Sequence, residues 1–157
     1  MPTLAYNKRA KFDYEITDTF EAGLVLYGHE VKSVKTGHVS LKGSYVTLRR
    51  TRNKPIPELY LTNSHIPRYK FSSNVADYDP TRPRKLLLKK KQIERLIGKK
   101  QEQGLTLVPI KLYTRRSLIK LEFGIGRGKK KVDKRESIKR RELDRRVRTL
   151  TKRKRKS

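Results

Sequence analysis

Apolar and polar residues alternate over several segments of the chain, as they do in β-strands that bury one face. Within residues 12–27, apolar residues at 14, 16, 20, 24 and 26 keep an even spacing over much of the run, which predicts one long strand. Gly23 lies inside this run and indicates a bend or a bulge. Runs of similar character predict four more strands at 44–50, 58–66, 105–115 and 117–126.

Two segments follow the helical spacing of three and four instead. In residues 29–37, two valines three positions apart and a final glycine predict a short helix. Residues 86–103 place four apolar residues on one helical stripe and stop at Gly104. Residues 67–84 show neither period and contain three prolines, which predicts a long loop of the kind that is often functional.

Five or six strands with two or three helices predict a mainly β domain. A small closed antiparallel barrel of OB type fits strands joined by short turns, because closure leaves no exposed sheet edge. We expect this barrel, with its flanking helices, to occupy residues 1–126, which is enough chain for one small domain.

The segment 127–157 differs from the rest in composition. It carries 17 Lys or Arg against four acidic residues, and only five apolar residues that could build a core. Such a segment stays disordered in isolation and orders on a polyanion. Leu143, Val147 and Leu150 have helical spacing, so we expect a basic C-terminal tail that becomes helical when phosphates neutralise it.

The net charge of the chain is +27, which predicts a nucleic-acid partner because dense positive charge is drawn to phosphate backbones. Mutual repulsion between such chains predicts a monomer. There is no cysteine, no apolar run of about 20 residues that would span a membrane, and no apolar N-terminal stretch typical of a secretory signal. We therefore expect a cytoplasmic protein without a membrane association.

The sequence gives little support for a catalytic function. The three histidines, His29, His38 and His65, are scattered without the spacing of metal ligands, and no carboxylates are placed for a two-metal site. The glycines of residues 124–128 lack the context of a nucleotide loop, and we interpret them as a hinge into the tail. We expect no catalytic residue, no metal and no cofactor.

Composition alone leaves three functions open. These are an RNA-binding module, a basic ribosomal protein or assembly factor, and an enzyme that modifies or cleaves RNA. Presence on every ribosome would favour the second, and turnover abolished by changing one carboxylate would favour the third.

Five motifs separate these alternatives. Asn7, Lys8 and Ala10 near the start are followed by EAGLVLYGHEVKSVKTGHVSLKGSYV at 21–46 and DPTRPRKLLL at 79–88, then by GLTLVPIKLY at 104–113 and GKKKVDKRESIKRRE at 128–142. Together they resemble the bacterial small protein B family, the SsrA-binding proteins that are partners of transfer-messenger RNA (tmRNA). The resemblance covers nearly the whole chain.

The resemblance implies a non-enzymatic factor of trans-translation with an OB-type barrel. The barrel would bind the tRNA-like domain of tmRNA, an RNA that it shares with elongation factor Tu. The tail would become helical in the vacant mRNA channel and decoding centre of a stalled ribosome, against 16S and 23S rRNA. The ribosome is then rescued and the nascent chain is tagged.

The resemblance also points to particular residues. In the body we expect RNA contacts or their immediate supports at Asn7, Lys8, Glu30, Lys32, Arg84 and Lys85. In the tail we expect ribosome contacts at Gly128, Lys129, Lys130, Asp133, Lys134 and Arg135, with Gly128 permitting a turn and Asp133 capping the helix. One position departs from the family, because Val132 stands where an aromatic residue or histidine is common, and valine cannot stack on a base.

Overall fold

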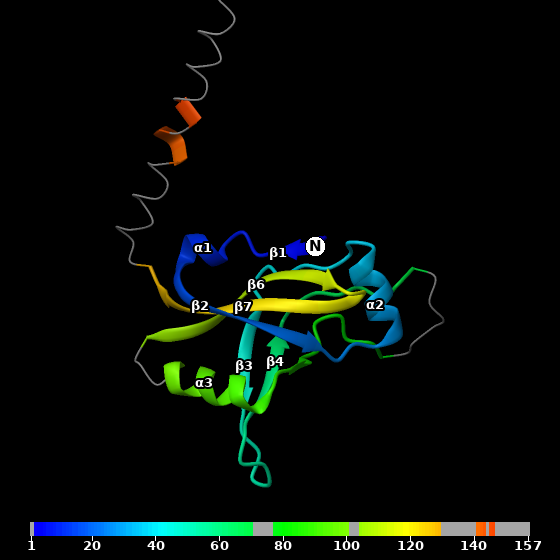
Figure 1. Ribbon diagram of the computed structural model, residues 1–157. Coiled ribbons are helices and arrows are strands. Elements are labelled where there is room, and N and C mark those ends of the chain that lie inside the picture. The colour runs from blue at the N-terminus through cyan, green and yellow to red at the C-terminus, as the bar shows by residue number, and fades with distance from the viewer. Residues whose placement is uncertain (1, 71–76, 101–103, 130–140, 144, 147–157) are drawn as a thin grey trace, which may run out of the picture.

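The computed structural model describes residues 2–70, 77–100, 104–129, 141–143 and 145–146. One antiparallel sheet with short helices around it makes up the body (Figure 1). The elements in chain order are β1 (Thr3–Tyr6), α1 (Ala10–Asp13), β2 (Tyr14–Leu24), α2 (Gly28–Lys35), β3 (Tyr45–Arg49), β4 (Glu58–Thr62), β5 (Arg84–Leu87), α3 (Lys90–Lys100), β6 (Leu105–Arg115) and β7 (Leu118–Gly128).

The strands follow the order β1-β6-β7-β2-β5-β4-β3 across the sheet. The long strand β2 pairs with β7 along most of its length and then with β5 at its end, and Gly23 pairs with both Lys120 and Leu87. The register shift of β2 lies between Ile16 and Asp18. Gly23 therefore marks the change of partner strand, and the bulge predicted there lies near the start of the strand instead.

The predicted closure of the barrel is not confirmed. Among the described residues the ladder begins at β1 and ends at β3, and no strand pairing joins β3 to the outer edge of β6. Part of that edge is already used, because β1 pairs with Lys111 to Tyr113 and Asn7 bonds to the carbonyl groups of Pro109 and Ile110. Pro109 also has no N–H to offer a new strand. The fold is a mainly β antiparallel sheet with open ends.

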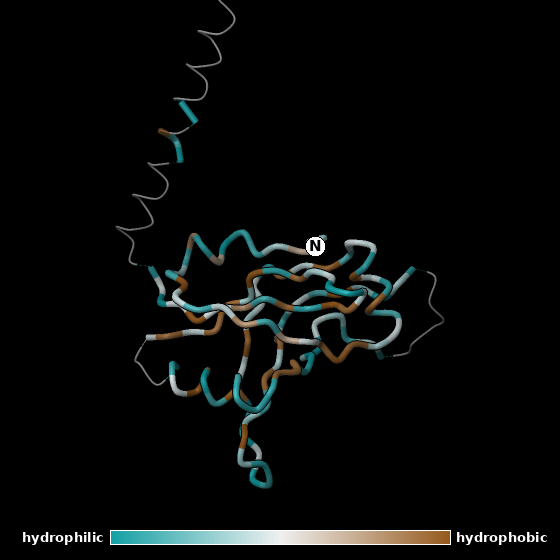
Figure 2. The backbone as a smooth tube through the Cα atoms, in the orientation of Figure 1, coloured by the Kyte–Doolittle hydropathy of each residue, from teal (hydrophilic) through white to brown (hydrophobic). Residues whose placement is uncertain are grey.

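The core lies between the strands and is built from the alternating residues that predicted them. Phe20 and Phe123 stack at its centre with ring centroids 5.7 Å apart, and Leu59, Leu61 and Leu121 are fully buried around them. Figure 2 shows the apolar residues gathered along the central strands, whereas the hairpin between β3 and β4 ends in a hydrophilic tip. Burial of alternate side chains explains why β2, β6 and β7 were predictable.

Two differences from the predicted elements concern short segments. The predicted helix over 86–103 begins only at Lys90, because residues 84–87 form β5 between β2 and β4. The strand β1 and the single turn α1 were not predicted at all, since four residues hold too little periodicity. The helix predicted within 29–37 is confirmed as α2. Within the described part of the chain, no helix is long and apolar enough to cross a membrane.

Candidate nucleic-acid interface

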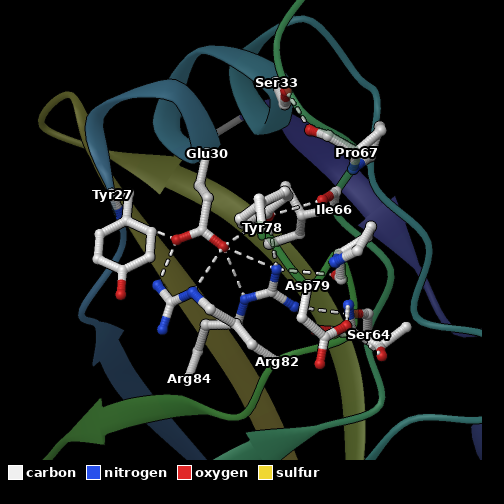
Figure 3. Close-up of polar contacts among 12 residues, drawn as sticks. Tyr27, Glu30, Ser33, Ser64, Ile66, Pro67, Tyr78, Asp79, Arg82 and Arg84 are labelled. Atoms are coloured by element: carbon white, nitrogen blue, oxygen red, sulfur yellow. Dashed lines mark hydrogen bonds and ion pairs between the residues drawn. The ribbon is translucent and has the colours of Figure 1, made fainter. Parts of the chain in front are cut away.

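Glu30 is the centre of a buried polar cluster at the N-terminus of α2 (Figure 3). It is the third residue of that helix, and its Oε1 accepts a hydrogen bond of 2.8 Å from the backbone N–H of Tyr27, which caps the helix. Its side chain is fully buried. A buried carboxylate requires cationic partners, because burial disfavours the charged form.

Arg84 and Arg82 supply those partners from the same segment. Arg84 is also fully buried, and its Nε and Nη2 donate to Glu30 Oε2 at 2.9 and 2.7 Å. Its remaining N–H groups donate to the carbonyl oxygens of Ser64 at 2.6 Å and Pro80 at 2.9 Å. Arg82 donates to both oxygens of Glu30. The cluster thus joins α2, β5 and the loops that precede β5.

The electrostatics follow from these contacts. Burial acts to raise the pKa of Glu30, but the hydrogen bonds from Arg82, the Tyr27 backbone, Arg84 and Tyr78 outweigh it, so the pKa lies below the ordinary value. Tyr78 donates its hydroxyl to Glu30 Oε2 at 2.9 Å. Burial and this carboxylate raise the pKa of Tyr78 to about 12. Glu30 is therefore ionised and Tyr78 neutral at neutral pH.

Burial assigns Glu30 and Arg84 a supporting role, since neither side chain reaches the surface. The two residues beside this buried pair, Arg82 and Tyr27, are partly exposed. The guanidinium of Arg82 lies over the ring of Tyr27, 3.9 Å from its centroid, and Tyr27 is exposed. The predicted site residues did not include Tyr27, Tyr78 or Arg82, although Arg82 lies within the DPTRPRKLLL motif.

Asn7 and Lys8 lie in another part of the molecule. The side chain of Asn7 donates to the Pro109 carbonyl at 2.8 Å and accepts from the backbone N–H of Arg9 at 3.3 Å, so it fixes the entry into α1. Lys8 is exposed and borders a groove together with Arg9 and Lys42. Asn7 is half-buried and serves the backbone, whereas the charged side chain of Lys8 is exposed to solvent.

Lys32 and Lys85 are separated from each other as well. Lys32 is exposed on α2, and its Nζ lies 5.8 Å from the centroid of the Tyr69 ring. Lys85 lies on β5 with its Nζ 3.6 Å from Glu58 of β4. The six predicted body residues therefore do not form one surface.

The tail residues are described only at its start. Gly128 ends β7 opposite Tyr14, and the backbone N–H of Lys129 donates to the Asp13 carbonyl at 2.8 Å. In this structure both residues extend the β2–β7 ladder. Lys130, Val132, Asp133, Lys134 and Arg135 lie outside the described residues.

Another surface, of which the sequence analysis predicted only Lys85, runs across one face of the sheet. Registers place Lys120 of β7 beside Gly23 of β2, Gly23 beside Leu87 of β5, and Lys85 beside Tyr60 of β4. Alternate residues of a strand share a face, so this face also carries neighbours two positions away. We call it the outer strip; its members are Glu21 of β2, Val25 just after that strand, Arg49, Glu58, Tyr60, Lys85, Leu87, Leu118 and Lys120.

The outer strip combines exposed apolar side chains with cations. Val25, Leu87 and Leu118 are 47%, 52% and 60% exposed. At the β7 end, Leu118 and Lys120 border a shallow hollow of about 240 Å³. They also line a neighbouring hollow together with Arg116 and with Arg115, which pairs with Glu21 at 3.2 Å. Apolar side chains exposed beside cations suit the faces of unpaired bases and the phosphates between them. No periodicity marks this strip in the sequence, because its residues come from five strands.

The turn that carries Arg116 has an unusual backbone. Arg116 and Ser117 alone connect β6 to β7, and both have left-handed φ angles, 51° and 66°. This is the pattern of a type I′ hairpin, which strongly prefers Asn-Gly or Gly-Gly. Non-glycine residues held there store strain, and such strain is concentrated at functional sites. The observation supports a function for the exposed Arg116.

Comparisons with known proteins agree with this geometry. The family model described as SmpB protein matches residues 4–153. The SsrA-binding protein of Thermosipho africanus is 45% identical over 156 residues, covering 99% of this chain and 100% of that protein. The SsrA-binding protein of Geobacillus kaustophilus is 47% identical over 144 residues, covering 92% of this chain and 88% of that protein.

A solved structure is similar as well. One of its chains is 43% identical and superimposes with a TM-score of 0.61 over 85% of this chain and 92% of that one. It is described as "tmRNA-SmpB: a journey to the center of the bacterial ribosome". The predicted family is confirmed by relatives that match along nearly their whole length, and the chain belongs to the SmpB protein family.

Proposed function

We propose that this protein binds the tRNA-like domain of tmRNA and delivers it to stalled ribosomes for trans-translation. One observation carries the proposal: relatives named SsrA-binding proteins match this chain at about 45% identity along nearly its entire length. The similar solved structure, described by the words tmRNA, SmpB and bacterial ribosome, supports the same conclusion. The protein acts as a binding factor in the cytoplasm and not as an enzyme.

Within the body, the outer strip is the RNA-binding surface. It places exposed leucines where bases can pack and lysines where phosphates can pair. The buried Glu30–Arg84 cluster contributes indirectly, because it holds Arg82 and Tyr27 at the end of β2. An OB-type sheet with one face given to RNA agrees with this assignment.

The tail serves the ribosome. Its positive charge suits the rRNA phosphates of an empty mRNA channel, where it becomes helical against 16S and 23S rRNA. The helical backbone of residues 141–143 and 145–146 supports this tendency. Gly128, Lys129, Lys130, Asp133, Lys134 and Arg135 are the proposed contacts at its start. The protein acts as a monomer and meets elongation factor Tu through the shared RNA.

The test compares binding of the full-length protein to a tRNA-like tmRNA fragment and to ordinary tRNA at near-physiological salt. We expect at least tenfold tighter binding to the fragment, about 1.4 kcal/mol. Equal affinity would contradict the proposal and favour a general ribosomal protein.

A double variant of the outer strip locates the surface. Substituting Leu87→Ser and Leu118→Ser changes two exposed residues, so it should weaken binding of the fragment roughly tenfold without altering the unfolding midpoint. Leu143→Ser makes the same chemical change at an exposed residue outside the strip and serves as the control. Unchanged affinity of the double variant would remove the outer strip from the binding surface.

A further inference from the structure

The hairpin between β3 and β4 continues well beyond the last paired residues of its strands. The ladder ends where Arg49 pairs with Glu58, and residues 50–57 connect the two strands. Figure 1 shows this connection projecting away from the other strands, on the opposite side of the body from α1. Hairpin connections usually have about two to five residues, so this connection is longer than most. We call residues 49–57 the basic arm.

The basic arm carries an isolated group of cations. Arg49, Arg50, Arg52 and Lys54 are all exposed, and the segment 49–57 contains no acidic residue. Two of the four have partners at the base of the arm. Lys54 pairs with Glu58, and the guanidinium of Arg49 lies 4.4 Å from the centroid of the Tyr60 ring.

The other two cations are unengaged. Within the described part of the chain, neither Arg50 nor Arg52 makes a hydrogen bond, an ion pair or a ring contact. Arg52 lies within the turn closed by the hydrogen bond from Lys54 N–H to the Thr51 carbonyl at 3.3 Å, and Arg50 lies directly before that turn. The nearest carboxylate in sequence, Glu58, is already shared by Lys54, Tyr60 and Lys85. Two unpaired guanidinium groups on this projecting connection are ready to bind phosphate bidentately.

The arm is also restrained, so that less conformational entropy is lost on binding. Pro55 and Pro57 limit the backbone of its returning half, and Pro57 is buried at the base. Restraint of a binding element in its bound form lowers the entropic cost of association. A flexible loop of the same charge would lack this advantage.

The base of the arm is continuous with the outer strip. Arg49, Glu58 and Tyr60 belong to that strip, and Glu58 connects to Lys85, two residues before Leu87. An RNA that lies on Leu87 and Leu118 therefore passes along Lys85 toward the tip of the arm.

We infer that the basic arm is a further RNA contact of the body, in which Arg50 and Arg52 bind backbone phosphates. This inference rests on the proposed function and extends it from the strip to the hairpin. The ligand chemistry is an RNA phosphate, which either the tRNA-like RNA or ribosomal RNA can supply. The continuity with the outer strip favours the tRNA-like RNA.

The experiment measures the affinity of the full-length protein for the tRNA-like fragment, and separately for ribosomes, at several salt concentrations. Replacing both arginines, R50Q with R52Q, should weaken binding of the fragment roughly tenfold at near-physiological salt. Each lost phosphate contact reduces the slope of log affinity against log salt by roughly 0.7–0.9, so the slope should fall by roughly 1.4–1.8. The charge-preserving variant R50K with R52K should keep most of the slope.

Two further variants complete the design. K35Q with K91Q removes two exposed charges from α2 and α3, and it should leave the slope close to that of the wild type. Replacing residues 50–57 by Asn-Gly removes the arm at a hairpin turn that β3 and β4 can accept. It should reproduce the loss seen with R50Q and R52Q.

Different outcomes test the role of the basic arm and the proposed function of the protein. A loss on ribosomes alone keeps the phosphate contact and assigns it to ribosomal RNA. Unchanged affinity and slope on both RNAs would overturn the inference. The proposed function is judged independently, by the preference of the wild type for the tRNA-like fragment over ordinary tRNA.

Discussion

At the scale of single residues, the buried pair of Glu30 and Arg84 is the most consequential feature of the molecule. Both side chains are fully buried, and every oxygen of the carboxylate accepts hydrogen bonds. A buried ion pair adds little stability compared with an apolar pair, but removing one partner leaves the other charge uncompensated. The cluster is therefore sensitive to single substitutions.

Replacing Glu30 by glutamine should lower the free energy of unfolding by about 3 kcal/mol, because Arg84 then lies buried without its carboxylate. Urea denaturation measures this change. Glu94→Gln on the exposed face of α3 is the matched control and should stay within about 0.5 kcal/mol of the wild type. Combining E30Q with R84M should cost less than the sum of the single variants. A cost of E30Q as small as that of the control would contradict the structural role.

The same residue predicts how stability depends on pH. Because the folded protein lowers the pKa of Glu30, its contribution is fully present above the ordinary pKa of about 4.3 and is lost as pH falls through the lowered value. Denaturation at several pH values should show a decline below about pH 4.3 that is shallower in E30Q. At the alkaline end, Tyr78 contributes stability that is lost as pH rises from about 10 to its folded pKa of about 12.

At the scale of elements, glycines and turns show how local conformation serves the sheet. The glycine-rich segment 124–128 was interpreted as a hinge, but it forms the end of β7. A Cβ on Gly124 would lie 2.6 Å from Ile16 Cγ2 and 3.0 Å from the Asp18 carbonyl oxygen. Glycine there leaves room for Ile16 and the Asp18 carbonyl where β2 bulges against its neighbour β7, so the residue is required for packing and does not act as a hinge.

Substitutions in the β6–β7 turn should affect stability and RNA binding in opposite directions. Ser117→Gly should raise the free energy of unfolding by about 1 kcal/mol, because glycine adopts the left-handed conformation without strain. Adding Arg116→Asn creates the Asn-Gly pair preferred in this turn and should not lower stability below that of the single variant. Affinity for the tRNA-like fragment should fall only when Arg116 is replaced. Denaturation and binding measured on both variants check this, and an equal affinity of the two would exclude Arg116 from the interface.

At the scale of the whole molecule, charge divides the chain into a body and a tail, although each is basic. The boundary between a body of residues 1–126 and a tail of residues 127–157 stays a prediction. The ladder adds one detail, because Arg127 and Gly128 still pair with β2 and Lys129 bonds to Asp13. A truncation that preserves the body should therefore end after Lys129.

Truncation after Lys129 should leave the preference for the tRNA-like fragment intact and strongly reduce affinity for stalled ribosomes, because in the proposed function the tail supplies the charge for the channel. Binding assays with both partners at near-physiological salt measure this. Truncation after Gly126 is the informative comparison, since it also removes ladder pairs and should lower the free energy of unfolding. Loss of RNA preference after either truncation, with the fold intact, would assign recognition to the tail.

Some features were determined by the sequence alone. The long strands β2, β6 and β7 follow from an alternation sustained over many residues, and the basic tail follows from its composition. The family was predictable because its motifs extend over nearly the whole chain, and the matching relatives confirm it. These features depend on neighbours in sequence, so no folded contact is needed to infer them.

Other features were decided only by the tertiary structure. The strand β5 escaped prediction because its inward positions are Arg84 and Leu86, and an arginine can occupy a buried position only when a distant carboxylate such as Glu30 meets it. The outer strip joins residues of five strands, and Asn7 and β1 occupy part of the outer edge of β6 in an open sheet. Pairing between segments far apart in the chain leaves no periodic pattern, and for that reason the buried cluster and the candidate RNA surface became visible only in the folded molecule.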